Sequence, residues 1–176
     1  MTLNDNWVIM SEEDYKKMRE PYIPTRVEVI FVLESPPRSG KYFYNPDGTV
    51  TEPLFMAMMT CVLGYDKDAV PVKSEGLREF AAQGYLLVDA TYSPVNKLKK
   101  KKRDEVIRKN SSRLMNELRK FSRSKNTRII LVKANVCRIL EPLLKKQFNV
   151  ANEGVVIPFP AYGHQKDFCR KIKKLL

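Results

Sequence analysis

Short apolar runs separated by helix-length segments are the feature that most constrains how this chain can fold. Continuous runs of this kind are typical of strands buried on both faces, whereas a half-exposed strand would alternate apolar and polar residues. The runs span Val27–Leu33, Tyr85–Val88, Arg128–Val132 and Gly154–Ile157. Strands joined by helical crossovers pair in parallel. The expected fold class is therefore α/β, a three-layer α/β/α sandwich around a central, mostly parallel sheet of four strands.

The segments between these runs carry helix signals. A short helix over 11–20 is expected to begin at the capping residue Ser11 and to stop at Pro21. A long helix should follow residue 103, because apolar and small residues recur there at helical spacing. The residues of that face are Ile107, Ser111, Leu114, Leu118 and Phe121. Further helices are expected at about 53–63, at 75–83 with Ser74 as the cap, at 134–147 and at 164–175.

Length and sequence patterning favour one intracellular domain. A chain of 176 residues can bury a substantial core, so a single domain 1–176 is expected, with the first helix at about 11–20 and the core at about 26–176. The N-terminus lacks the apolar region of a signal peptide, and no apolar run is long enough for a membrane helix. A cytoplasmic, nucleoid-associated protein is expected.

Cysteine and histidine usage gives no metal-binding pattern. Cys61, Cys137 and Cys169 lie far apart, form no C-x-x-C pair and accompany a single histidine. We therefore expect three buried, reduced cysteines. No metal and no cofactor are expected.

The charge of the chain indicates an anionic partner. Thirty-two Lys and Arg residues face twenty Asp and Glu residues, which gives a net charge of +12 and a pI near 9.6. Nucleic acid, an acidic protein and a membrane surface all fit such an excess. The sequence Lys97-Leu-Lys-Lys-Lys-Lys-Arg103 is the densest cluster, and we call it the basic segment. Charges this dense repel one another unless phosphates neutralise them. A second cluster at 170–174 is equally well explained as a solvated helix end.

Polar residues follow the predicted strands at the edge where ligands bind in parallel sheets. The segments concerned are 34–46, 89–97, 133–135 and 158–164. They contain acids, prolines and many aromatic residues, and the basic segment adjoins them. Aromatic rings beside cations suit stacking on nucleic-acid bases. The sequence thus predicts a nucleic-acid site at this edge.

Two acids at this edge are candidates for catalysis. Glu34 follows the first strand and Asp89 the second, and an acid that ends a buried strand costs free energy unless it is paired or functional. Structural alternatives remain open. Glu34 could pair with Arg38 or Lys133, and Asp89 could cap a turn.

Several motifs resemble the iron–sulfur branch of the uracil-DNA glycosylase superfamily. Leu33-Glu-Ser-Pro-Pro37 is similar to its G-E-A-P-G loop, and Gly40-Lys-Tyr-Phe43 to its G-R-P-F, in which the Phe stacks on the flipped base. Ser93-Pro-Val-Asn-Lys97 resembles P-P-x-N-R. Leu131–Val136 matches the position of the L-G-x-x-A turn. Ile157-Pro-Phe-Pro160 occupies the place of H-P-S-P. The matches run in order from about residue 27 to the C-terminus.

The resemblance implies a DNA glycosylase of base-excision repair that hydrolyses the N-glycosidic bond of a flipped deaminated base, either uracil or hypoxanthine/xanthine. Its partner would be duplex or single-stranded DNA, and it would act as a monomer without a membrane. Glu34 and Asp89 would be catalytic. The expected base contacts are Phe43, Tyr42, Tyr44, Asn96, Pro158 and Phe159. The expected DNA contacts are Arg38, Lys41, Lys97, Lys99, Lys100, Lys101, Lys102, Arg103, Lys133, Tyr162 as a wedge and His164.

Departures from the family pattern keep other functions open. Ile157 replaces the histidine that stabilises the departing base, Asp89 replaces the base-reading asparagine, and the four cluster cysteines are absent. Core packing is the alternative for Phe43. One alternative function is a catalytically inactive relative that binds damaged or single-stranded DNA. Another is an enzyme acting on free nucleotides in a flavodoxin-like sheet, although no G-x-G-x-x-G loop is present.

Overall fold

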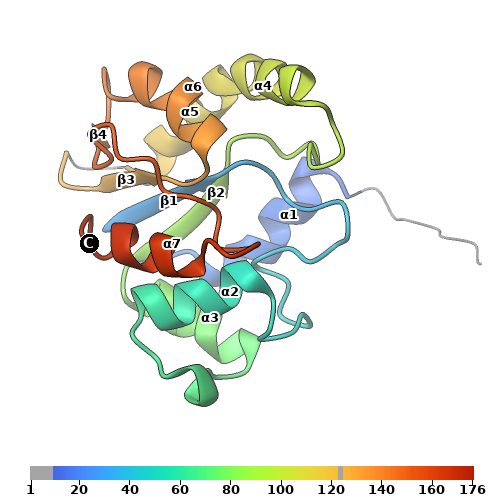
Figure 1. The fold of residues 1–176 in the computed structure, drawn as a ribbon, viewed down its shortest axis with the longest axis vertical. Coiled ribbons are helices and arrows are strands. Elements are labelled where there is room, and N and C mark those ends of the chain that lie inside the picture. The colour runs from blue at the N-terminus through green and yellow to red at the C-terminus, as the bar shows by residue number, and fades with distance from the viewer. Residues whose placement is uncertain (1–9, 123–124) are drawn as a thin grey trace, which may run out of the picture.

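A parallel four-stranded sheet forms the centre of the protein. The computed structural model describes residues 10–122 and 125–176. In these residues the strands are β1 (Val29–Leu33), β2 (Tyr85–Asp89), β3 (Arg128–Leu131) and β4 (Asn149–Val150), in the order β2-β1-β3-β4. Every neighbouring pair is parallel. The expected α/β sandwich with a parallel sheet of four strands is confirmed (Figure 1).

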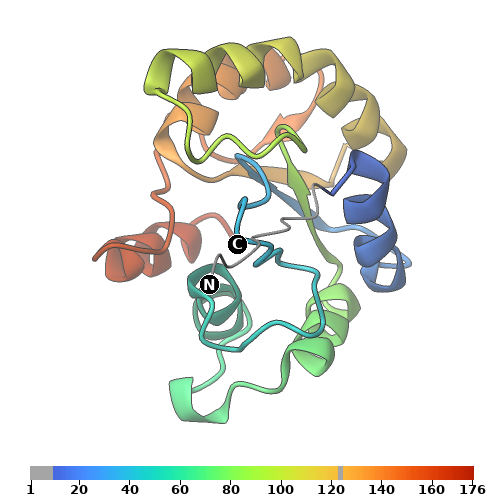
Figure 2. The same cartoon turned by 90° about the vertical axis from the view of Figure 1, so that its right-hand side faces the viewer.

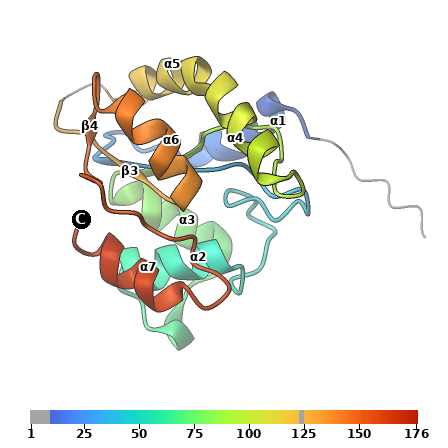
Figure 3. The same ribbon diagram turned by 45° about the horizontal axis from the view of Figure 1, so that its top comes forward.

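Helices cover both faces of this sheet (Figures 1 and 3). One face carries α4 (Lys100–Lys109), α5 (Ser111–Phe121) and α6 (Ala134–Leu144). The other carries α2 (Pro53–Ala57), α3 (Lys73–Ala82) and α7 (Gln165–Ile172). Helix α1 (Glu12–Arg19) lies beside β2, between α5 and α3 (Figure 2). All five residues of β1 are buried, as a central strand covered on both faces requires.

The helix boundaries follow local chemistry. Ser11 caps α1 in a reciprocal capping box with Asp14, as expected. The expected long helix is two helices that meet at Asn110, whose side-chain amide donates to the carbonyl of Val106. Helix α3 begins at Lys73 after Val72, so Ser74 is not its cap. Helix α2 continues as a π-helical turn over Met58–Val62, within the expected 53–63 range.

The fourth strand is not where the sequence pattern placed it. β4 is Asn149–Val150, and Ile157 of the expected strand makes only an isolated bridge to Val132. The fully buried Asn152 explains this. Its Oδ1 accepts from the Leu131 N–H at 2.7 Å, and its Nδ2 donates to the Leu131 carbonyl at 3.0 Å. One side chain therefore occupies the positions on the edge of β3 that a pairing backbone would use.

A disulfide joins two distant segments. Cys61 in the π-helical turn and Cys169 in α7 are bonded, with their Cα atoms 5.0 Å apart, and only Cys137 is a free, buried thiol. The expectation of three reduced cysteines is therefore wrong for two of them. The two cysteines are 108 residues apart in the sequence, so no local pattern indicated that they pair.

The outer edge of β2 is covered by the loop that follows β1. The Tyr44 hydroxyl accepts a hydrogen bond at 2.8 Å from the N–H of Leu87, which would otherwise lack a partner at a sheet edge. None of the described helices is long and apolar enough to cross a membrane.

The structure predicts that Asn152→Ala destabilises the fold by about 2–4 kcal/mol, because two buried backbone groups of Leu131 lose their partner. Chemical denaturation would measure the loss. Asn149→Ala, at an exposed position of β4, is the control and should be nearly neutral. Equal effects for the two variants would contradict the role assigned to Asn152.

Candidate functional site

The strand register brings the predicted site residues to one edge of the sheet. Leu33 pairs with Asp89, so Glu34 and Asp89 end neighbouring strands. Lys133 and Pro158 follow the bridged residues Val132 and Ile157 at the same edge. The prediction that Glu34, Asp89, Lys133 and Pro158 share one edge is therefore confirmed. The loops after β1 and β2 and the start of α4 lie together on this side of the molecule (Figures 1 and 3).

Glu34 is the centre of an ion-paired cluster at this edge. Only 5% of its surface is exposed. Its Oε2 accepts from Lys133 Nζ, its Oε1 accepts from Asn135 Nδ2 at 2.6 Å, and Arg103 Nε lies 3.6 Å from Oε1. We call Glu34, Arg103, Lys133 and Asn135 the Glu34 cluster. It lies between the ends of β1 and β3, where the strand order reverses, which is the usual ligand position in open parallel sheets.

Lys133 has a backbone conformation that lysine rarely adopts. Its φ is 88° and its ψ is 137°, at the position that caps α6. Its N–H donates to the Ile157 carbonyl at 2.8 Å, and its carbonyl accepts from the Cys137 N–H at 3.0 Å, so both backbone groups are fixed. Such conformations cost about 1–3 kcal/mol and concentrate at functional sites.

The basic segment is docked onto the loop after β1. Arg103 Nη2 donates to the carbonyls of Asn96 at 3.1 Å and Leu98 at 3.3 Å. The Asn96 side chain accepts from the Arg38 N–H at 3.2 Å. The lysine side chains of the segment are exposed, as are Arg38 and Lys41. The predicted cationic surface therefore adjoins the Glu34 cluster through Arg103.

The basic segment also forms the start of α4, the wrong end of a helix for cations. The first turn of α4 holds no acid, and its cap, Lys99, makes no side-chain capping hydrogen bond. The macrodipole of a helix is positive at its N-terminus, so lysines there repel it. An anion on this surface would relieve that repulsion.

Asp89 is placed at the edge as expected but is closed off from solvent. Only 2% of it is exposed, and its Oδ2 has no hydrogen-bond partner among the described residues. The Tyr42 hydroxyl is likewise buried and unpartnered. Burial raises the pKa of Asp89 to about 8, and the neighbouring Arg19 opposes that shift. Asp89 is therefore mainly protonated at neutral pH.

A buried polar network from α1 and α5 seals the Asp89 side of the edge. Arg19 donates to the Tyr92 hydroxyl and to Glu117 Oε1, both at 2.7 Å. Arg113 Nη1 donates to Glu117 Oε2 at 2.7 Å, and its Nη2 donates to the Asp89 carbonyl at 2.8 Å. The Tyr15 ring lies 4.8 Å from the Tyr42 ring and 6.1 Å from the Tyr92 ring.

The three predicted base-stacking rings lie in the core. Tyr42, Phe43 and Tyr44 are 2%, 3% and 0% exposed. The Phe43 centroid lies 4.9 Å from that of Tyr44 and 5.3 Å from that of Phe80. The prediction that these rings contact a base is therefore wrong for this structure, and core packing is the correct interpretation of Phe43. Large aromatic surfaces in a polar loop are stabilised most by burial.

A buried ion pair that the sequence did not reveal holds this aromatic loop. Lys73, 2% exposed, donates to Glu52 Oε2 at 2.6 Å and to the Tyr42 carbonyl at 2.8 Å. Glu52 Oε1 accepts from the Thr49 N–H at 3.0 Å. Burial lowers the pKa of Lys73, while Glu52 acts in the opposite direction. Lys73 and Asn135 are the positioning residues that sequence reasoning missed, because a lysine beside a predicted cap and an asparagine in a helix start give no distinctive signal.

The loop after Ile157 presents one aromatic side chain to solvent. Tyr162 is 97% exposed at a φ of 53°, whereas Pro158 and Phe159 are half-buried. His164 is exposed and caps α7. Ile157 is fully buried, so the position of the missing family histidine is part of the core.

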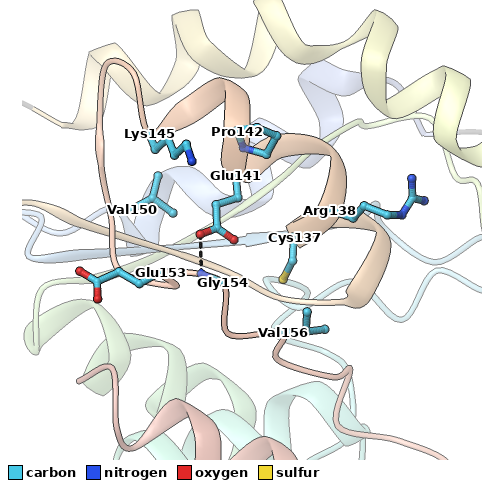
Figure 4. Close-up of a pocket in the computed structure, with 9 residues that line it drawn as sticks. All are labelled: Cys137, Arg138, Glu141, Pro142, Lys145, Val150, Glu153, Gly154 and Val156. Atoms are coloured by element: carbon cyan, nitrogen blue, oxygen red, sulfur yellow. Dashed lines mark hydrogen bonds between the residues drawn. The ribbon is translucent and has the colours of Figure 1, made fainter.

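Two cavities lie away from the Glu34 cluster. The larger, of about 580 Å³, lies between α6 and the segment 150–156 and is lined by Arg138, Lys145, Glu141 and Glu153 among others (Figure 4). The second, of about 480 Å³, includes Arg119, Lys125 and Lys145 in its lining. Neither is lined by a residue of the Glu34 cluster. Within residues 10–122 and 125–176, no group of three or more His, Cys, Asp or Glu side chains is arranged to hold a metal ion.

Comparison of the chain with protein-family models, with curated proteins and with solved structures finds no match.

The raised pKa of Asp89 predicts a pH-dependent stability. The folded-state pKa of about 8 exceeds the ordinary 3.8, so the stabilising contribution of the neutral acid is complete below about pH 3.8 and is lost as the pH rises through about 8. Asp89→Asn removes this titration. The variant should gain stability relative to the natural protein as the pH rises from about 3.8 to about 8, with no further gain above that, as measured by denaturant unfolding. The exposed Asp68→Asn is the control, and a pH-independent difference for Asp89→Asn would contradict the assignment.

Proposed function

We propose that this protein binds nucleic acid, DNA in the first instance, along the carboxyl edge of its sheet. The observation that carries the proposal is the position of Arg103. It belongs to the basic segment, donates to the carbonyls of Asn96 and Leu98, and lies beside Glu34 at the strand-order reversal. Phosphates on the exposed lysines would thereby hold a nucleotide next to the Glu34 cluster. A cytoplasmic, nucleoid-associated location follows from this proposal.

The extent of the positive surface favours a polymer over a small ligand. Six cations in seven residues exceed what one nucleotide phosphate can neutralise, and the chain carries a net charge of +12. The first turn of α4 has no acid to neutralise its lysines, so a row of phosphates would remove more repulsion there than a single phosphate could. The free-nucleotide alternative needs a glycine-rich phosphate loop that the chain does not have.

Tyr162 supplies an aromatic contact for such a partner. A fully exposed ring at the tip of a loop gains little from folding, but stacking on a base is worth about 1–3 kcal/mol. The loop that carries it follows Ile157 at the same edge as Glu34. Tyr162 therefore takes over the role that the buried Phe43 cannot fill.

Binding through the basic segment predicts a steep salt dependence. Changing Lys99, Lys100, Lys101 and Lys102 to Ser should weaken DNA binding and flatten the log–log salt slope by about 0.9 for each duplex phosphate that the protein no longer neutralises. Fluorescence anisotropy at several salt concentrations would measure it. The matched control changes four exposed lysines near the opposite edge, Lys120, Lys125, Lys145 and Lys146. An equal flattening by both sets would place the footprint elsewhere.

Base excision is the second candidate function, and the position of Glu34 favours it. Glu34 lies at the strand-order reversal beside the basic segment, and from there its carboxylate would orient a water and stabilise positive charge on the sugar of a bound strand. Flipping a base to reach it costs a few kcal/mol. Water would add to C1′ of the sugar, and the bonding electron pair would leave with the base. Lys133 and Asn135 could donate to that base in place of the histidine whose position Ile157 occupies.

Glu34→Gln tests base excision. If the carboxylate acts in the reaction, the variant should excise a base about 10²-fold more slowly while binding DNA nearly normally. Oligonucleotides with uracil, hypoxanthine, xanthine or mismatched thymine, followed by alkaline cleavage of abasic sites, provide the measurement. The exposed Glu75→Gln is the control. No abasic product from the natural protein on any substrate would leave the inactive DNA-binding relative as the function.

A further inference from the structure

Lys133 combines a partly exposed side chain with an acid in direct contact with its amine. Its Nζ donates to Glu34 Oε2, and 30% of its side chain is exposed. Asn135 Nδ2 holds the other oxygen of Glu34 at 2.6 Å, which leaves Oε2 facing the amine. The exposed lysines of the basic segment, Lys97 and Lys99–Lys102, make no ion pair among the described residues. Lys133 thus differs from them in having a proton carrier beside its amine.

The backbone at Lys133 indicates that its side chain matters. A φ of 88° with a ψ of 137° is readily adopted only by glycine, which would occupy the position without strain. The chain places a lysine there instead. Because its N–H and carbonyl are fixed by Ile157 and Cys137, the strained conformation directs the amine of Lys133 from the end of β3 onto Glu34.

We propose that Lys133, with Glu34 as proton carrier, forms an imine with the aldehyde of an abasic deoxyribose. This inference rests on the proposed binding of DNA at this edge, and it names an abasic site as the DNA lesion that the Glu34 cluster takes. Phosphates on either side of the lesion lie on the basic segment, and the ring-opened sugar reaches the Lys133 amine. Lysine amines form such bonds with carbonyl groups when a neighbouring group manages the proton.

The atoms balance without a further reactant. The Lys133 ammonium passes one proton to Glu34, and its lone pair forms a bond to C1′ of the aldehyde while the carbonyl electrons move to oxygen. Glu34 returns that proton to the oxygen. The nitrogen then loses a second proton by the same route, and the oxygen departs as water. The product is a protonated imine, and both hydrogens of the water come from the ammonium.

Borohydride trapping tests the inference. The full chain is incubated with an oligonucleotide that contains one abasic site, and borohydride converts any imine into a stable amine. The expected result is a one-to-one protein–DNA adduct, which mass spectrometry locates on Lys133. Lys133→Arg keeps the positive charge but lacks a nucleophilic amine, so trapping should fall at least about tenfold. Lys146→Arg, at the opposite edge, should trap as the natural protein does.

Binding is measured separately, by anisotropy with a tetrahydrofuran analogue of the abasic site, which has no aldehyde. Binding without an adduct overturns the inference and leaves the proposed function intact. An adduct on another lysine, or one that persists in Lys133→Arg, also overturns it. Absence of binding overturns the proposed function and this inference together.

Discussion

The ion-paired carboxylate of Glu34 is the interaction on which the carboxyl edge of the sheet depends. Glu34 ends β1, and its partners Lys133 and Asn135 begin α6, so the pairing fixes the gap at which the strand order reverses. Arg103 extends the same contact to α4 and thereby to the basic segment. Breaking a buried ion pair by removing one partner commonly costs about 3–5 kcal/mol. A ligand that competes for Lys133 therefore acts on the whole edge.

The two acids at this edge have opposite environments. Glu34 contacts cations and keeps a partially exposed lysine beside it, whereas Asp89 is sealed under Tyr15 and Tyr42 and holds its proton. Environments that separate two acids in this way commonly give them different tasks. In the proposed chemistry Glu34 is therefore the reacting acid, whereas Asp89 lies beside a buried network of Arg19, Arg113 and Glu117, which anchors α1 and α5 to the end of β2.

The sheet and its edge could be predicted from the sequence, because continuous apolar runs report burial and parallel strands share a carboxyl edge. Contacts between distant side chains could not. Asn152 replaces a strand pairing, Lys73 and Glu52 form a buried ion pair, and Cys61 meets Cys169. None of these has a local pattern. Phe43 shows the limit most clearly, since a ring in a polar loop suggests a ligand contact until its packing partners are known.

The basic segment and Lys133 both lower the stability of the free protein. Lysines at the start of α4 oppose the helix dipole, and the backbone of Lys133 is strained, so both cost stability in the free protein. The core does not require the exposed lysines of the basic segment, whereas Lys133 also serves as the ion-pair partner of Glu34. Phosphates bound to the basic segment would offset the repulsion between its lysines and the helix dipole. The strained backbone of Lys133 would hold its amine in position to react with a ligand carbonyl. The proposed ligand, a strand of DNA with an abasic site, would carry both groups and so would act on both unfavourable features at this one edge.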